Sequence, residues 1–331
     1  MNQTLAERTV KGKRDARRAH YVWAMRARLI AAFAAVYIIW GSTYLAIRFA
    51  VETLPPLLMA GARFLIAGAI LLAWSRFHDG TGTPTQRDWR TGFVSGALLL
   101  LGGNGLVVWA EQRVPSGLAA LLVAVVPLWM VMLDWARRDG RRPPAPVFAG
   151  LALGLVGLGL LVGTDALHGR GAIDNAGVVG LMIASLLWAA GSLYTKHAAK
   201  ASTGLHGAAT QMVSGGLCLL LVAVSLGEPA TLDLAHASRR SLLGFFYLVT
   251  FGSLVGFTAY VYLLAHTTAA KASTYAYVNP VVAVLLGWAL AHEEVTSRTL
   301  LAAVVILAGV AIITVARDTS APQALEKRAA A

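Results

Sequence analysis

The sequence carries little charge and a single cysteine. Only 13% of its 331 residues are Asp, Glu, Lys or Arg, whereas 57% are hydrophobic and the mean hydropathy is +0.65. Soluble domains typically carry about 25% charged residues, so this composition predicts a membrane protein. The lone cysteine, Cys218, excludes an intramolecular disulfide and a metal site built from several thiolates. Its position in an apolar run favours a packing role.

Motifs that would indicate catalysis or ATP hydrolysis are also missing. The sequence contains no HExxH, no GxSxG and no GxxxxGK[ST] phosphate-binding loop. Its eight histidines fall in predicted tails and loops or near the ends of apolar segments. A polytopic membrane enzyme is therefore the less favoured alternative, and no cofactor or metal is expected.

What the sequence does contain is a series of long apolar segments. A run of about 18 or more apolar residues can cross a bilayer as a helix, at a rise of ~1.5 Å per residue. The predicted fold class is therefore an all-α polytopic membrane protein. We predict ten transmembrane helices, at 29–51, 57–75, 91–112, 116–135, 146–163, 177–198, 206–226, 241–264, 271–291 and 297–315.

Basic residues are distributed unevenly on the two sides of these segments. With the N-terminus inside, the cytoplasmic segments hold 21 Lys and Arg and the outer loops hold five. We therefore expect a cell (inner) membrane protein with cytoplasmic tails at 1–28 and 316–331. The first tail either lies along the anionic inner leaflet or is a disordered segment that only fixes topology. Topology also explains the net charge of +12, so no nucleic-acid partner is expected.

An internal repeat relates residues 29–163 to residues 177–315. The matching positions are Trp40 with Trp188 and Arg48 with Lys196, 148 residues apart, and Val126-Pro127 with Asn279-Pro280, 153 residues apart. Because each half has five predicted spans, the second half enters the membrane from the opposite side. The loop RRDGRRPP after the fourth span and its counterpart HEEVTSR after the ninth differ in charge, as this inversion requires. The sequence thus predicts two inverted five-helix repeats.

Four long motifs resemble a known family. They are YIIWGSTYLAIRF, PPLLMAGARFLIAGAILL, GNGLVVWAEQRVPSGLAALLVAVVPL and ASTYAYVNPVVAVLLGWAL, in this order along the chain. They are similar to the drug/metabolite transporter superfamily, to its proteins with two EamA domains, and the resemblance covers roughly residues 29–315. It implies a basket of ten helices in inverted repeats around a central cavity, working as an exporter of small metabolites such as amino acids and related amphipathic solutes. It does not imply one substrate.

Aromatic and hydroxyl side chains near the middle of three spans are the candidates for substrate binding. Rings beside hydroxyls and an amide suit an amphipathic solute with an apolar side chain. Packing between helices is the alternative role for each of them. Because the three candidates on the ninth span are two residues apart, they cannot all face one way on a regular helix. The candidates are Trp40, Ser42, Thr43 and Tyr44 on the first span, Trp188 and Ser192 on the sixth, and Tyr275, Tyr277 and Asn279 on the ninth.

Two prolines are candidates for helix breaks beside the site. Pro127 and Pro280 occupy equivalent positions in the two repeats, near the middle of the fourth and ninth spans. Each removes a backbone donor and frees a carbonyl, as in transporters that bind substrate at interrupted helices. The alternative is ordinary kinked packing.

A third set of polar residues lies in the predicted outer half of the membrane. Charged residues inside spans are costly and are candidates for function. We predict a gate or salt-bridge network at the outer mouth of the cavity, with static helix-stapling pairs as the alternative. Its candidate members are Arg48, Glu52, Arg63, Asn104 and Glu111.

No Asp or Glu lies near the middle of any predicted span. The small multidrug transporters of the same superfamily exchange protons for lipophilic cations through such a carboxylate, so that chemistry is not expected here. A neutral or zwitterionic small-molecule substrate fits better. A membrane receptor or scaffold that binds a ligand without moving it is the remaining alternative; inverted repeats argue against it, because they supply the two conformations of alternating access. The oligomeric state stays open.

Overall fold

The computed structural model describes residues 2–78, 83–110, 112–113, 122–138, 140, 142–167, 174–198, 204–291 and 296–316. Within these ranges the chain forms helices, turns and bends, and no strand. The prediction of an all-helical fold is confirmed for this part of the chain.

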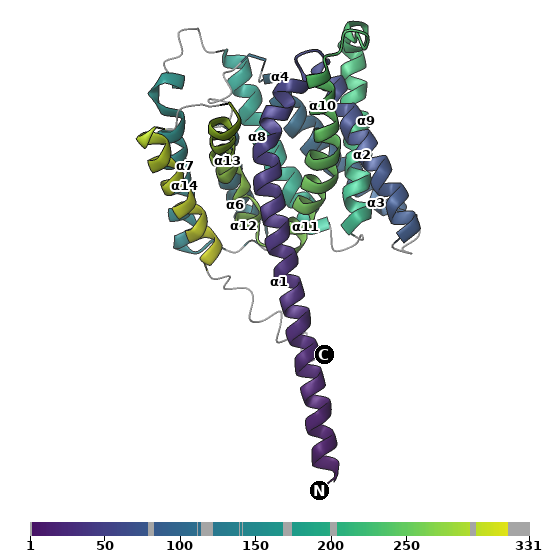
Figure 1. Ribbon diagram of the computed structural model, residues 1–331, viewed down its shortest axis with the longest axis vertical. Coiled ribbons are helices and arrows are strands. Elements are labelled where there is room, and N and C mark those ends of the chain that lie inside the picture. Colours follow the sequence, from purple (N-terminus) through teal and green to yellow (C-terminus); the bar gives the residue numbers. More distant parts are fainter. Residues whose placement is uncertain are drawn as a thin grey trace.

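The first helix, α1 (Asn2–Ala50), is 49 residues long and extends well beyond the bundle at its N-terminal end (Figure 1). The boundary that the sequence suggests at residue 29 lies inside this helix. The basic segment before it contains one glycine, Gly12, and no proline. Nothing in that segment therefore interrupts a helix that the apolar part nucleates.

The remaining helices follow α1 in a compact bundle. Their bounds are α2 (Pro56–His78), α3 (Gln86–Gly96), η1 (Ala97–Gly105), α4 (Leu106–Ala110), α6 (Val126–Ala136), α7 (Ala145–Leu167), α8 (Asn175–Ala198), α9 (Gly204–Ser225), η3 (Glu228–Thr231), α10 (Arg239–Tyr247), η4 (Leu248–Phe257), α11 (Thr258–His266), α12 (Ala269–Ala272), α13 (Tyr275–Ala291) and α14 (Ser297–Val315). The segments η1 and η4 are π-helical, and each joins two α-helices into one long rod.

Six helical segments are long and apolar enough to cross a membrane within the described ranges. They are Trp23–Ile47, Pro56–Phe77, Gln86–Ala110, Asn175–Ala198, Leu205–Ser225 and Arg239–His266. Shorter apolar helices lie at Val126–Ala136, Ala145–Leu160 and Leu300–Ile313. The length and composition of these helices therefore fit a membrane-spanning protein. The total of ten spans stays a prediction.

The helices pack in three groups (Figure 1). Helices α7 and α14 pair at one side of the bundle, and α9 packs on α2 and α3 at the other. Between them α1 contacts α13, η4 and α11, while α8 contacts η1, α6 and α11. The site described below lies between this central group and α2.

Small residues bring the outer helix pairs close together. A Cβ added to Gly68 of α2 would lie 2.8 Å from the backbone nitrogen of Val213 in α9. A Cβ on Gly150 of α7 would lie 2.8 Å from the carbonyl oxygen of Gly309 in α14. Such backbone approaches are the usual way in which helices associate without a hydrophobic driving force between them.

Polar side chains cap the starts of two helices. The carboxylate of Glu228 in η3 accepts hydrogen bonds from the backbone nitrogens of Leu57 (3.2 Å) and Leu58 (2.7 Å) at the start of α2. At the start of α3, Thr85 and Asp88 form a reciprocal capping box. These contacts satisfy backbone donors that the helices leave unpaired at their first turns.

Candidate functional site

A cavity of about 810 Å³, which includes the open space at its mouth, lies among the central helices. Its walls come from α1, α2, η1, α4, α6, α8, η4 and α13, and therefore from both halves of the chain. The lining residues are Trp40, Thr43, Ile47, Arg63, Phe64, Gly103, Asn104, Val107, Val123, Val126, Ala184, Ser185, Trp188, Gly252, Phe257, Tyr275 and Asn279.

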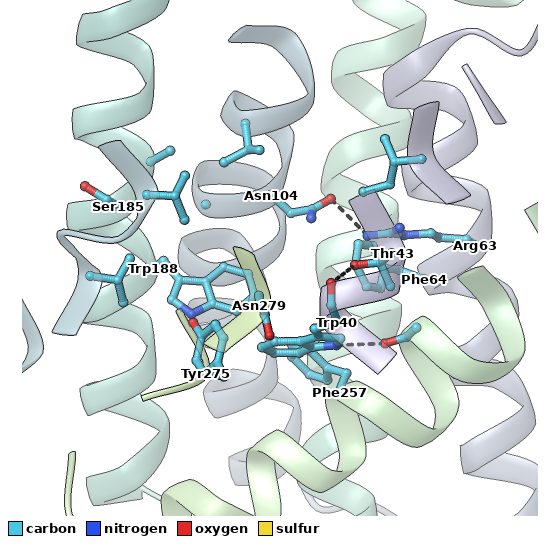
Figure 2. Close-up of a pocket in the computed structure, with 17 residues that line it drawn as sticks. Trp40, Thr43, Arg63, Phe64, Asn104, Ser185, Trp188, Phe257, Tyr275 and Asn279 are labelled. Atoms are coloured by element: carbon cyan, nitrogen blue, oxygen red, sulfur yellow. Dashed lines mark hydrogen bonds between the residues drawn. The ribbon is translucent and has the colours of Figure 1, made fainter. Parts of the chain in front are cut away.

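Aromatic rings close one end of the cavity (Figure 2). The Trp40 ring lies 5.7 Å from the Trp188 ring, 5.0 Å from Tyr260 and 4.9 Å from Tyr275, measured between centroids. The Tyr260 ring also contacts Trp188, at 5.9 Å, and Tyr275, at 5.3 Å. We call these four residues the ring cluster. Several of the contacts are edge-to-face, which is a favoured geometry for aromatic pairs.

Glycines in the two π-helical segments make room for the two tryptophans. A Cβ on Gly103 of η1 would lie 2.7 Å from Cε3 of Trp188, and a Cβ on Gly256 of η4 would lie 2.6 Å from Nε1 of Trp40. The indole nitrogen of Trp40 also donates a hydrogen bond of 3.2 Å to the carbonyl oxygen of Gly252. Trp188 is therefore packed against η1, and Trp40 is packed against η4. Such segments are frequent at functional sites.

An arginine lies in the wall away from the ring cluster (Figure 2). The Arg63 side chain of α2 is buried, with 5% of its surface exposed, and its Nη2 donates a 3.2 Å hydrogen bond to Oδ1 of Asn104. Its guanidinium carbon also lies 4.3 Å from the centre of the Phe64 ring. A buried cation is costly unless it is paired. Within the described part of the chain, Arg63 forms no ion pair with a carboxylate.

Asn279 is the polar residue of the cavity wall on α13. It is buried, and its Oδ1 has no hydrogen-bond partner among the described residues. The next residue, Pro280, lies inside α13, whereas Pro127 lies in the first turn of α6 directly after a turn at 124–125. The backbone break before α13 falls earlier, at 273–274. The two prolines thus stand at different distances from the break in their helices.

Five of the predicted binding residues lie together in the cavity wall: Trp40, Thr43, Trp188, Tyr275 and Asn279. Three others point to neighbouring helices. The Ser42 hydroxyl lies 2.6 Å from the Tyr247 hydroxyl, and the buried Ser192 hydroxyl lies 2.6 Å from that of Tyr260. The Tyr277 hydroxyl lies 3.4 Å from the carbonyl oxygen of Leu151 in α7.

The predicted gate is only partly described. Arg63 and Asn104 lie together in the cavity wall, as stated above. Glu52 is exposed and lies 3.8 Å from Nη1 of Arg240, at the start of α10. Glu111 and the side chains of Tyr44 and Arg48 lie outside the part of the chain that the structure describes.

Sequence reasoning missed Ser185, which lines the cavity, and Tyr260, which belongs to the ring cluster. Ser185 lies one helical turn before Trp188 and accepts a 3.2 Å hydrogen bond from Nε1 of Trp129. Tyr260 lies one turn after Gly256 and completes the ring cluster. A helical wheel drawn through Trp188 would have found Ser185. Tyr260 had no such signal, because its position depends on how α11 packs. Among the described residues, no group of three His, Cys, Asp or Glu side chains could hold a metal ion.

Comparison with known proteins identifies the family of this chain. A model of the EamA-like transporter family matches residues 27–163 and again residues 175–315, which together make up most of the sequence. This chain belongs to the EamA-like transporter family. The two matched segments are the two halves of the repeat that the sequence indicates, and the resemblance to the drug/metabolite transporter superfamily is confirmed.

Relatives of this EamA-family chain carry names that agree with a membrane location. It is 40% identical over 290 residues to the uncharacterized inner membrane transporter YedA of Escherichia coli, covering 87% of this chain and 91% of that protein. It is 27% identical over 279 residues to the uncharacterized transporter YoaV of Bacillus subtilis, covering 83% and 92%. A solved crystal structure superposes with a TM-score of 0.73 at 20% identity, covering 88% of this chain and 99% of that one. The last match supports the fold alone.

Proposed function

We propose that this EamA-family protein is a secondary transporter of small amphipathic solutes, which it moves across the inner membrane by alternating access between two inverted five-helix repeats. The observation that carries the proposal is the cavity at the junction of the two halves, closed at one end by Trp40 and Trp188. Binding sites of transporters with inverted repeats lie at such junctions.

The packing of the two tryptophans supports the inverted repeat. They occupy matching positions in the sequence, 148 residues apart, and their rings contact each other at 5.7 Å. Equivalent residues of two copies meet only near the axis that relates the copies. Their surroundings also match: Trp188 packs on Gly103 of η1, and Trp40 packs on Gly256 of η4. Two copies of one unit, related by a pseudo-two-fold axis between the tryptophans, account for this reciprocity.

The position of the cavity supports an outward-facing conformation. Thr43 and Ile47, in the last two turns of α1, and Arg63, in the first part of α2, line it beyond the ring cluster. With the N-terminus in the cytoplasm, these residues lie toward the outer surface. On the inner side of the cluster, the hydroxyls of Tyr37 and Thr274 lie 2.5 Å apart and tie α1 to the turn before α13. In this conformation the ring cluster and this contact form the inner barrier.

Counterflow tests the proposal. Purified protein in liposomes preloaded with an unlabelled neutral amino acid should accumulate the labelled solute, and a panel of metabolites extends the test. Insensitivity to an imposed pH gradient indicates a facilitator, and gradient-driven accumulation indicates a titrating group such as Glu111. Binding of a solute without counterflow would favour a receptor, and chemical conversion of a solute would favour an enzyme. Net export is the expected direction, measured as faster efflux from cells that express the protein.

A further inference from the structure

The cavity wall contains a buried cation whose charge the described structure does not neutralise. Arg63 has 5% of its surface exposed, and among the described residues its side chain makes one hydrogen bond, to the neutral amide of Asn104. Its Nε is buried and has no partner among the described residues. A guanidinium has five N–H donors in a planar arrangement that matches a carboxylate. Arg63 therefore presents N–H donors without a described partner, and a positive charge, beside the cavity.

A second buried polar group in the same wall is a hydrogen-bond acceptor, whereas Arg63 supplies only donors. Oδ1 of Asn279 is an acceptor with no hydrogen-bond partner in the described part of the chain. Buried polar atoms are almost always hydrogen-bonded, so an unpartnered acceptor beside a cavity is a position at which a water or a donor group of a ligand can bind. Asn279 lies on α13 and Arg63 on α2, so the two groups reach the cavity from different halves of the chain.

The rest of the wall is mostly apolar. The rings of Trp40, Trp188, Tyr275 and Phe257 and several aliphatic side chains supply it. Of the seventeen described residues that line the cavity, Arg63 alone is charged. A solute that pairs with Arg63 and also fills this space must carry one anionic group on an apolar body.

We propose that the transported solute is a monocarboxylate, that its carboxylate binds the guanidinium of Arg63, and that Asn279 accepts a hydrogen bond from an N–H group of the same solute. This inference rests on the proposed transport function and names the chemistry that its site selects. A dianion such as a phosphate monoester would leave an excess negative charge in the apolar cavity, because Arg63 supplies a single positive charge. A cation would meet Arg63 with the same sign of charge.

Matched solutes test the proposal on the unmodified protein. Leucine has both groups, 4-methylpentanoate has only the carboxylate, leucinamide has a neutral amide instead of the carboxylate, and 3-methylbutylamine has only the amine. The phenylalanine series, with 3-phenylpropanoate, phenylalaninamide and 2-phenylethylamine, supplies a second size. Affinity is measured by calorimetry on purified full-length protein, and counterflow is measured in parallel. In at least one series the amino acid and the carboxylate should both bind at least about 30-fold more tightly than the amide and the amine, because the last two lack the charge pair with Arg63.

Two variants and a control connect this preference to the residues. Arg63→Gln should remove the preference for the carboxylate over the amide. Asn279→Leu should weaken binding of the amino acid about tenfold while leaving the carboxylate that lacks an N–H unchanged. Arg90→Gln, on the exposed surface of α3, is the matched control and should bind all solutes like the unmodified protein. If Arg63→Gln does not fold, the preference for the carboxylate over the amide is measured on Arg63→Lys and on the unmodified protein instead.

The outcomes separate this inference from the transport function. Counterflow of solutes with no dependence on the carboxylate would overturn the inference and leave transport standing. Absence of counterflow for every solute would overturn transport itself. Equal loss of thermal stability in Arg63→Gln and Glu111→Gln, with no change of solute preference, would assign Arg63 to an internal ion pair and also overturn the inference.

Discussion

The rings of Trp40 and Trp188 meet edge to face, with centroids 5.7 Å apart and planes at 77°, although 148 residues separate them in the chain. One comes from α1 and the other from α8, the first helix of each EamA match. Their contact links the two halves of the protein at the closed end of the cavity.

Truncation of either tryptophan should impair transport more than folding. We expect Trp40→Ala and Trp188→Ala each to lower the counterflow rate about tenfold or more, because each removes part of the cavity wall and of the inner barrier. A tenfold lower rate corresponds to an increase of ~1.4 kcal/mol in the activation free energy. Both variants should still elute as monodisperse protein in size-exclusion chromatography. Trp23→Ala, at a residue with 68% exposure, is the control and should transport normally. Unchanged counterflow in a variant would exclude that residue from the site.

The glycines behind the tryptophans should not tolerate a methyl group. A Cβ at Gly103 would lie 2.7 Å from Trp188, and one at Gly256 would lie 2.6 Å from Trp40. We expect Gly103→Ala and Gly256→Ala to cost ~1–3 kcal/mol through overpacking and to lower the thermal midpoint of the purified protein.

Gly159→Ala supplies the matched control for these two variants. It lies inside α7, and a Cβ there has no neighbour within 4 Å. Its expected effect is neutral or stabilising by up to ~1 kcal/mol, because alanine is the better helix former. Equal midpoints for all three variants would contradict the tight packing of the tryptophans on the π-helical segments.

The exposed pair between Glu52 and Arg240 should matter for gating but not for stability. Exposed ion pairs contribute ~0–1 kcal/mol, so Glu52→Arg and Arg240→Glu should hardly shift the thermal midpoint. If this contact helps to hold the turn after α1 against α10 in the outward-facing conformation, each single reversal should slow counterflow and the double reversal should restore most of it.

The same cycle with Arg48 in place of Arg240 tests the pairing that the sequence suggests. Recovery in the Arg48–Glu52 swap alone would assign the gate to the end of α1. Equal slowing in the single and double reversals of both cycles would remove Glu52 from any gating pair.

A carboxylate placed next to Arg63 should compete with the substrate. In Asn104→Asp the new carboxylate takes the position of the amide oxygen, which lies 3.2 Å from Nη2 of Arg63, and neutralises the cation internally. We expect the protein to fold with an unchanged or higher thermal midpoint and to bind leucine about tenfold or more weakly, as the loss of a charge-assisted hydrogen bond requires. Asn104→Ser, which adds no charge, is the control. Leucine binding that is equal in the two variants would argue against a carboxylate on Arg63.

Sequence spacing predicts which residues of a helix share a face, but not which face lines the cavity. Tyr275 and Asn279 are four residues apart, share a face of α13 and both line the cavity, whereas Tyr277 between them faces α7. Sequence spacing excludes a common face for all three, but it does not say which face meets the cavity. Ser192 shows the same limit: it lies one turn from Trp188, and its hydroxyl is used by Tyr260.

The sequence by itself determined the helical fold, the membrane character and the repeat. Each of these follows from local composition or from spacing along the chain: apolar runs of sufficient length, and tryptophans and prolines that recur at fixed offsets. Only the tertiary structure decided which side chains share the cavity, that Arg63 pairs with Asn104, and that η1 and η4 make room for the two tryptophans. The physical reason is that helix formation uses backbone hydrogen bonds within one segment, whereas the rotation of each helix about its own axis is set by its contacts with segments that lie far away in the chain.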